Sequence, residues 1–268
     1  MFDLPRITKS GLVRHVDYHQ SLGSTSDRAL ELAAGDELPL PLLVLAERQT
    51  DGRGRGTNRW WSADGALTFS LVLDPAAQGL PAEGRARVAL IAGLAVCEAL
   101  EAFVPRAEWR VKWPNDVFAN GGKVGGILTE SAPGFGERLI VGIGINVNNS
   151  TARGQGTGDR RQGTENIAPA GAVALVDLDP LPRELTDVLL AVLDRFELRW
   201  GELLEGRFSE LACAYRQRCL LTGKTVTVTS GEERVVGRCR GIDGRGALVL
   251  ATERGHRTII AGSIDAWE

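Results

Sequence analysis

The stretch WRVKWPND, residues 109–116, decides the fold of this 268-residue chain together with the segments that follow it. Trp109, Val111 and Trp113 alternate with polar residues, which is the period-two pattern of a β-strand. Pro114 ends that strand because proline cannot donate to a β-ladder. After the turn signal ANGG, two further runs read as strands: residues 123–130 and 139–146. This part of the chain is therefore predicted to be a compact block of strands.

Helices and strands are predicted on both sides of this block. Ser24 followed by Asp27 is a hydroxyl N-cap with an acid three residues on, which marks a helix start. Pro182 suits the first position of another helix, whose apolar stripe continues to Leu203. Helical spacing also predicts helices over 85–103 and 208–217, and apolar runs predict a buried strand at 42–46 and a strand with one more apolar face at 67–73.

The pattern changes from about residue 220. TVTVTS, VVGRCRGID, ALVLAT and RTIIAGSI are short β segments separated by glycine-rich turns. Short strands at such spacing are typical of a small β-barrel. We therefore predict two domains, residues 1–218 and 219–268. The second domain has few aromatic residues and a balanced charge, which argues against RNA binding by base stacking.

Composition and charge exclude several classes of protein. Hydrophobic residues make up 43% and charged residues 24% of the chain, an ordinary globular balance rather than that of a disordered chain. The net charge of −3 lacks the basic excess of nucleic-acid binders. No run approaches the roughly 20 apolar residues of a membrane span, and no signal peptide is evident. Four cysteines without CxxC spacing predict free thiols in a reducing cytoplasm, and with three histidines they form no metal-ligand pattern.

The segment Gly52-Arg53-Gly54-Arg55-Gly56 is the first with potential chemistry. Its glycines let backbone amides approach a ligand, and its arginines carry fixed charge with forked donors. Such a loop suits a carboxylate or a phosphate. It is neither a Walker A loop nor a GxGxxG fingerprint, because the required residues do not follow. A solvated, flexible turn is the alternative interpretation of this segment alone.

Three further motifs lie in the β-rich block. KWPND at 112–116 places a lysine and a polar pair at a strand end, for which a surface turn is the alternative. Lys123 opens KVGGIL, whose glycines weaken a strand unless a ligand or a β-bulge requires them. GIGINVN at 142–148 leaves one strand face bare, for a flat ring or a closely packed helix. Together these cations and Asp116 suit the activation of a carboxylate by ATP, since fixed cations stabilise a pentacovalent phosphate and Mg²⁺ neutralises pyrophosphate.

At these four motifs, in this order, the sequence resembles the biotin protein ligase family. The resemblance covers most of the chain and implies an α+β fold. Its catalytic domain would be similar to class II aminoacyl-tRNA synthetases, with a mixed β-sheet flanked by helices, followed by a small SH3-like barrel. It also implies a two-step reaction. Biotin and ATP give biotinyl-5′-AMP and pyrophosphate, and the ε-amine of a lysine on a biotin carboxyl carrier domain of an acyl-CoA carboxylase then attacks the mixed anhydride.

The resemblance also implies roles for individual residues. Lys123, Arg55 and Asp116 would be the catalytic set. Asp116 would in addition hold Mg²⁺, and we hypothesise that it helps the acceptor amine to lose its proton. The biotin-binding residues would be Ser24, Thr25, Ser26, Gln49, Gly52, Arg53, Gly54, Arg55, Lys123 and Gly126. The residues that bind ATP and the adenylate would be Arg53, Arg55, Trp60, Lys112, Asn115, Lys123 and Asn146.

The chain departs from the family pattern in places. Ser26 stands where the family often has asparagine, which offers more hydrogen-bonding groups, and Asn58 stands where a basic residue is common. The polar segment 150–166 matches no motif and is expected to be a mobile surface loop. Because the biotin-contacting segment begins at residue 24, we expect no N-terminal winged-helix domain and no DNA partner.

Two other functions stay open at this stage. A lipoate–protein ligase shares the general fold and reaction type, but it usually lacks the pair of GRGR and KWPND motifs. A non-catalytic biotin-binding regulator would be expected to have a DNA- or partner-binding domain.

Overall fold

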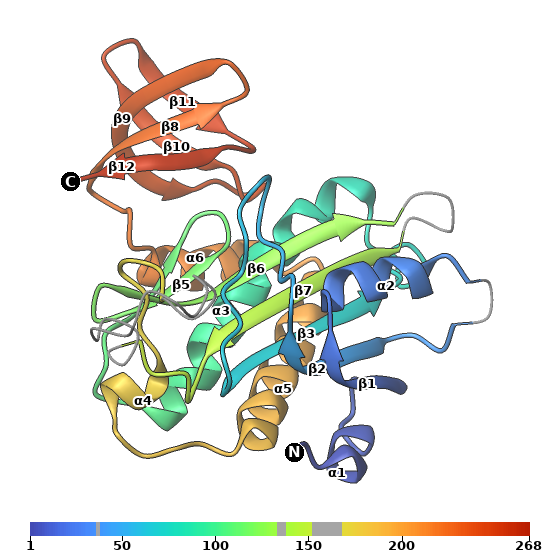
Figure 1. Ribbon diagram of the computed structural model, residues 1–268. Coiled ribbons are helices and arrows are strands. Elements are labelled where there is room, and N and C mark those ends of the chain that lie inside the picture. Colours follow the sequence, from blue (N-terminus) through green and yellow to red (C-terminus); the bar gives the residue numbers. More distant parts are fainter. Residues whose placement is uncertain (36–37, 133–137, 152–167) are drawn as a thin grey trace.

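The structure is a computed structural model that describes residues 1–35, 38–132, 138–151 and 168–268. A mixed sheet with helices packed on it is followed by a small β-sheet at the C-terminal end of the chain (Figure 1). The predicted α+β class is therefore confirmed. The segment predicted as a mobile loop, 150–166, lies almost wholly outside the described residues.

The larger sheet has seven strands and mixed direction. The first two strands in its spatial order run parallel, and all the remaining neighbouring pairs are antiparallel. In that order the strands are β1 (His15–Leu22), β2 (Leu42–Gln49), β3 (Ala66–Leu73), β7 (Leu139–Asn146), β6 (Gly122–Ser131), β5 (Asp116–Ala119) and β4 (Trp109–Lys112).

Helices pack on both faces of this sheet, whose successive side chains point to opposite sides. Leu42 and Val44 of β2 pack under Ala29 of helix α2 (Thr25–Ala33). Leu43 belongs to the main core on the other face. On that face the long helices α3 (Ala86–Phe103) and α5 (Leu185–Leu204) pack with α6 (Phe208–Arg218). The remaining helices are short: α1 (Leu4–Thr8), the 3₁₀ turn Ala82–Gly84 and α4 (Leu175–Leu178).

None of the helices in the described part of the chain combines the length and apolar character that a membrane span requires.

The structure differs from the sequence predictions at two of these elements. The strand that carries Lys112 ends before Pro114, as predicted, but the residues that follow form the turn of a tight hairpin, in which Lys112 of β4 pairs with Asp116 of β5. Strand β5, only four residues long, was not predicted. Pro182 is not the first helical residue, since α5 begins at Leu185. The reason is that Arg183 exchanges backbone hydrogen bonds with the Asn148 side chain, at 2.9 and 2.8 Å, instead of joining the helix.

The smaller sheet has five antiparallel strands in the order β11-β10-β9-β8-β12. The segment RTIIAGSI, predicted as one β run, contributes to two strands because the chain bends at residues 260–261 between them. Trp113 donates from Nε1 to the Gly246 carbonyl at 3.1 Å, and Leu220 N–H donates to Val111 at 2.8 Å. These bonds fasten the smaller sheet beside β4. Its strands are β8 (Thr225–Ser230), β9 (Glu233–Ile242), β10 (Leu248–Thr252), β11 (Gly255–Ile259) and β12 (Ser263–Trp267).

Candidate active site

A cavity of about 660 Å³ lies where the larger sheet, the 52–60 segment and the smaller sheet meet. This volume falls in the ordinary range for small-ligand sites, roughly 300–1,000 Å³. Every residue predicted to bind biotin, ATP or metal lines it except Gly52, which sits at the base of the 52–60 segment. The predicted residues along its wall are Ser24, Thr25, Ser26, Gln49, Arg53, Gly54, Arg55, Trp60, Lys112, Asn115, Asp116, Lys123, Gly126 and Asn146.

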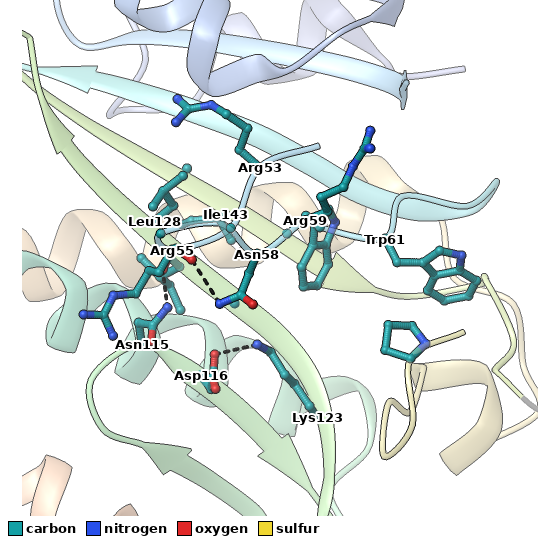
Figure 2. Close-up of a pocket in the computed structure, with 18 of the residues that line it drawn as sticks. Arg53, Arg55, Asn58, Arg59, Trp61, Asn115, Asp116, Lys123, Leu128 and Ile143 are labelled. Carbon is teal, nitrogen blue, oxygen red and sulfur yellow. Dashed lines mark hydrogen bonds and ion pairs between the residues drawn. The ribbon is translucent and has the colours of Figure 1, made fainter. Parts of the chain in front are cut away.

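Two lysines flank one carboxylate on the floor of the cavity. Lys123 Nζ lies 2.6 Å from Asp116 Oδ1, and Lys112 Nζ lies 3.8 Å from Asp116 Oδ2 (Figure 2 shows the Lys123 pair). The β4–β5 hairpin and the β5–β6 pairing bring the three side chains together. Burial lowers the pKa of Lys112, and the nearby Lys123 charge lowers it further, whereas Asp116 raises it. The site therefore presents two ammonium groups around one anion.

The 52–60 segment is a small hairpin closed by its own backbone. Trp60 N–H donates to the Gly52 carbonyl at 2.8 Å, and Gly54 N–H donates to Asn58 at 2.8 Å. A side chain at Gly52 would lie 2.8 Å from the Trp60 carbonyl, so only glycine closes the hairpin at this distance. Gly52 thus shapes the loop from outside the cavity wall, and its predicted role in biotin binding stays a prediction.

The three arginines of this hairpin have different partners. Arg53 makes two hydrogen bonds to Glu130, at 2.8 and 2.7 Å, and lies 2.7 Å from Asp27. The Glu130 hydrogen bonds raise the pKa of Arg53. Arg59 pairs with Asp51. Arg55 instead donates to the Gly262 carbonyl at 3.1 Å, so Arg55 has no carboxylate partner among the ion pairs of the described residues. In Figure 2, Arg53 points away from Asp116 and Lys123.

The bare face predicted for the GIGINVN strand exists, and a flat ring lies on it. That ring is the protein's own Trp60. A Cβ at Gly144 would be 2.3 Å from Cε2 of the indole, and one at Gly126 would be 3.5 Å from Cζ3. Trp60 Nε1 and Trp61 Nε1 are buried without a hydrogen-bond partner in the described part of the chain. Buried donors are rarely left unpaired, so an acceptor on a ligand would satisfy them.

The segment Ser24–Ser26 forms another part of the wall. Ser24 accepts a hydrogen bond from Asp27 N–H at 3.4 Å as the N-cap of α2. The same residue both caps the helix and lines the cavity. Gln49 Oε1 accepts from the Thr25 N–H at 2.7 Å. Ser26 Oγ lies 3.2 Å from Ser70 Oγ, and a Cβ at Gly142 would be 2.5 Å from Ser26 Oγ. This wall is therefore a row of hydroxyl and amide groups held from β2, β3 and β7.

Two predicted nucleotide-binding asparagines make structural contacts. Asn115 donates from Nδ2 to the Ile127 carbonyl at 2.7 Å and fastens the β4–β5 turn to β6. Asn146 accepts at Oδ1 from Asn149 at 2.9 Å. Both still line the cavity, so these contacts fix where the two amides stand.

Two parts of the wall were missed in the sequence. Pro169, Ala170 and Ala172 lie along β6, where Lys123 N–H donates to Gly171 at 2.8 Å. Gly262, Ser263 and Ile264 come from the turn into β12 of the smaller sheet. Neither segment has a composition that marks a site. The smaller sheet therefore forms part of the cavity wall.

Comparisons with known proteins agree with this geometry. Residues 18–148 match the model of the biotin/lipoate A/B protein ligase family, and residues 221–267 match that of the biotin protein ligase C-terminal domain. A biotin–[acetyl-CoA-carboxylase] ligase of Mycobacterium tuberculosis is 33% identical over 94% of this chain and 88% of its own length. The chain belongs to the biotin protein ligase family. A biotin–[acetyl-CoA-carboxylase] ligase of Paracoccus denitrificans is 34% identical over 90% of this chain and 96% of its own.

Solved structures of the family have the same fold. The biotin protein ligase from Aquifex aeolicus, in complex with biotin and ATP, superimposes with a TM-score of 0.75 at 29% identity, covering 95% of this chain and 99% of that one. The predicted architecture of the family, a mixed sheet flanked by helices followed by an SH3-like domain, is therefore confirmed.

Proposed function

We propose that this protein is an ATP-dependent biotin protein ligase, which forms biotinyl-5′-AMP and transfers the biotinyl group to a lysine of a biotin carboxyl carrier domain. The observation that carries the proposal is the cavity in which all four family motifs meet, with Lys123, Asp116 and Lys112 on its floor. The relatives named as biotin–[acetyl-CoA-carboxylase] ligases support the choice of biotin as the acid and of a carboxylase as the acceptor.

The first step joins two anions, so it depends on positive charge. An oxygen of the biotin carboxylate attacks the α-phosphorus of ATP, the bond to the β-phosphate oxygen breaks, and pyrophosphate leaves. We assign this role to Lys123 and Arg55, which line the cavity, because the guanidinium of Arg53 is bound by two carboxylates, Glu130 and Asp27. Fixed donors of this kind stabilise the charge that builds up on the pentacovalent phosphorus.

Asp116 is the residue that would hold Mg²⁺. The described residues contain no cluster of three or more His, Cys, Asp or Glu side chains that could bind a metal by itself. A single carboxylate such as Asp116 suits Mg²⁺, which commonly takes one or two protein carboxylates and completes its shell with water and substrate phosphates. The ion would have to share this carboxylate with Lys123, which lies 2.6 Å from it. When bound, the ion would neutralise charge on the leaving pyrophosphate.

In the second step the acceptor amine attacks the carbonyl carbon of the adenylate and AMP leaves. The amine starts as an ammonium group, with a reference pKa of about 10.4, and must lose a proton first. Asp116 is the carboxylate in the cavity that we propose assists this loss. An Asp116→Ala enzyme should transfer biotin poorly from preformed biotinyl-AMP to a carrier domain. Full transfer by that variant would contradict the assignment.

The test of the function is biotin-dependent ATP–pyrophosphate exchange with Mg²⁺, compared with lipoate as the acid. Exchange with biotin alone supports the proposal, and exchange with lipoate alone would identify a lipoate–protein ligase. Biotin binding without any exchange would indicate a non-catalytic regulator. Lys123→Ala and Arg55→Ala should each cut exchange by orders of magnitude while circular dichroism shows an intact fold. A near-normal rate in either variant would contradict its role.

A further inference from the structure

Lys112 is held by aromatic rings from both sheets. Its Nζ lies 4.3 Å from the centroid of Trp267 in the smaller sheet and 5.9 Å from that of Phe118 in β5. The two rings meet edge to face, with centroids 6.5 Å apart and planes at 86°. The Lys112 side chain is 13% exposed. A cation over an aromatic face at this distance is attracted to the ring, and more strongly when water is excluded.

Trp267 is itself fixed to its sheet. It pairs with Val226 of β8 in the β12–β8 ladder. The next residue, Glu268, exchanges two backbone hydrogen bonds with Thr225, at 3.0 and 3.1 Å. The indole is therefore presented to Lys112 from a rigid ladder rather than from a loose segment.

The Trp267 ring is a second partner for the Lys112 ammonium group, beside Asp116. Lys112 Nζ is 3.8 Å from Asp116, which is longer than a direct hydrogen bond, whereas Lys123 is 2.6 Å from the same carboxylate. A four-carbon side chain without a second partner would close onto Asp116 or turn to solvent. Trp267 offers a partner that draws the ammonium away from Asp116 without neutralising its charge.

We propose that Trp267 is a positioning residue of the active site, whose indole face holds the Lys112 ammonium ready for the phosphates of ATP. The proposal rests on the function proposed above and extends it, because it gives the C-terminal sheet a part in nucleotide binding. The Lys112 side chain is only 13% exposed, so a substrate anion would reach this partly desolvated cation without first displacing much water.

A double-mutant cycle tests how Trp267 acts. Trp267→Leu keeps apolar bulk but removes the ring, and Trp267→Phe keeps a ring. In ATP–pyrophosphate exchange, Trp267→Leu should lower kcat/KM for ATP roughly ten-fold, as expected for a desolvated cation–π contact, and leave biotin affinity unchanged. Trp267→Phe should recover most of that loss. Because Trp267 acts through Lys112, the Lys112→Met variant should lose no further activity when Trp267→Leu is added.

The outcomes separate a positioning role from a structural one. Val236→Ala, on the exposed face of β9 in the same sheet, is the matched control and should behave as the parent. Additive losses in the double mutant, or an equal fall in biotin affinity, would overturn the proposal. So would an unchanged kcat/KM in Trp267→Leu.

A second measurement does not depend on catalysis. After reductive ¹³C-methylation of the lysines, the Lys112 signal, assigned by its loss in Lys112→Met, should show an upfield ring-current shift that disappears in Trp267→Leu. An unshifted signal in the parent would overturn the proposal even if the protein catalysed no exchange. Conversely, a shifted signal in a protein that shows no exchange would retain the contact and reject the ligase function.

Discussion

Gly144→Ala should lift the arginine hairpin from the sheet without disturbing the sheet itself. The added Cβ would lie 2.3 Å from Cε2 of Trp60 and 2.7 Å from Cζ2 and Nε1. Carbon atoms normally touch at about 3.5–4.0 Å, so the indole must move by about 1 Å or more. Strand β7 cannot give way, because β3 and β6 pair with it on both sides. The strain therefore falls on Trp60 and the 52–60 hairpin.

The size of the effect follows from the area of the ring. A half-buried tryptophan covers roughly 100 Å², which at about 25 cal/mol per Å² amounts to about 2–3 kcal/mol of docking free energy. A loss of about 2 kcal/mol raises the population of the undocked hairpin roughly thirty-fold. The hairpin contains Arg53, Arg55 and Arg59, each a site of tryptic cleavage. When opening is fast relative to cleavage, the rate of cleavage reports the open population.

The assay is limited trypsin digestion of ligand-free protein, with mass spectrometry to follow cleavage after these arginines. Gly144→Ala should be cut within the hairpin roughly thirty-fold faster than the parent, while its thermal unfolding midpoint changes little. Gly126→Ala is the matched control for hairpin opening, because its Cβ would be 3.5 Å from Trp60, an ordinary contact. Equal cleavage rates in Gly144→Ala and Gly126→Ala would refute the reasoning.

Two further predictions concern stability. Burial raises the pKa of Asp177, but hydrogen bonds from Ser150, Ala174 and Thr151 outweigh it and lower that pKa overall. The stabilisation is present above the unfolded-state pKa and is lost as the pH falls through the folded-state pKa. Asp177→Asn should therefore lower the free energy of unfolding by about 1 kcal/mol at pH 7. It should also flatten the acid side of a plot of melting temperature against pH. An unchanged acid limb would rule this out. Trp113→Phe removes the 3.1 Å bond to Gly246, and urea unfolding should show a loss of about 1–3 kcal/mol; an unaltered midpoint would mean that this bond does not fasten the smaller sheet.

Much of the site was predictable because its parts repeat simple local patterns. The glycines at 142 and 144 leave a bare strand face wherever the strand is placed, and the KWPND and KVGGIL lysines converge because their strands are joined by short turns. What could not be predicted depends on distant partners. No local signal announces that Trp60 lies on Gly144, or that Asn148 binds the backbone of Arg183 and delays helix α5.

Short elements were the other source of error. Strand β5 has four residues, too few for a period-two pattern to stand out from a turn. The segment 262–264, at the start of β12, has no charged or aromatic residue, yet it lines the cavity. Family resemblance implied roles for the motif residues, but it could not imply the contact between Lys112 and Trp267, which only the packing of the two sheets reveals.

The hydrogen bond from Arg55 to Gly262 spans 207 positions of the chain. Contacts of such sequence separation close a large loop, and they are slow to form when a chain folds. Helices α3 and α5 can acquire their structure from nearby residues, whereas this wall of the cavity requires the C-terminal sheet to be in place. During refolding, catalytic activity should therefore recover later than helical circular dichroism, because activity reports the last stage of assembly.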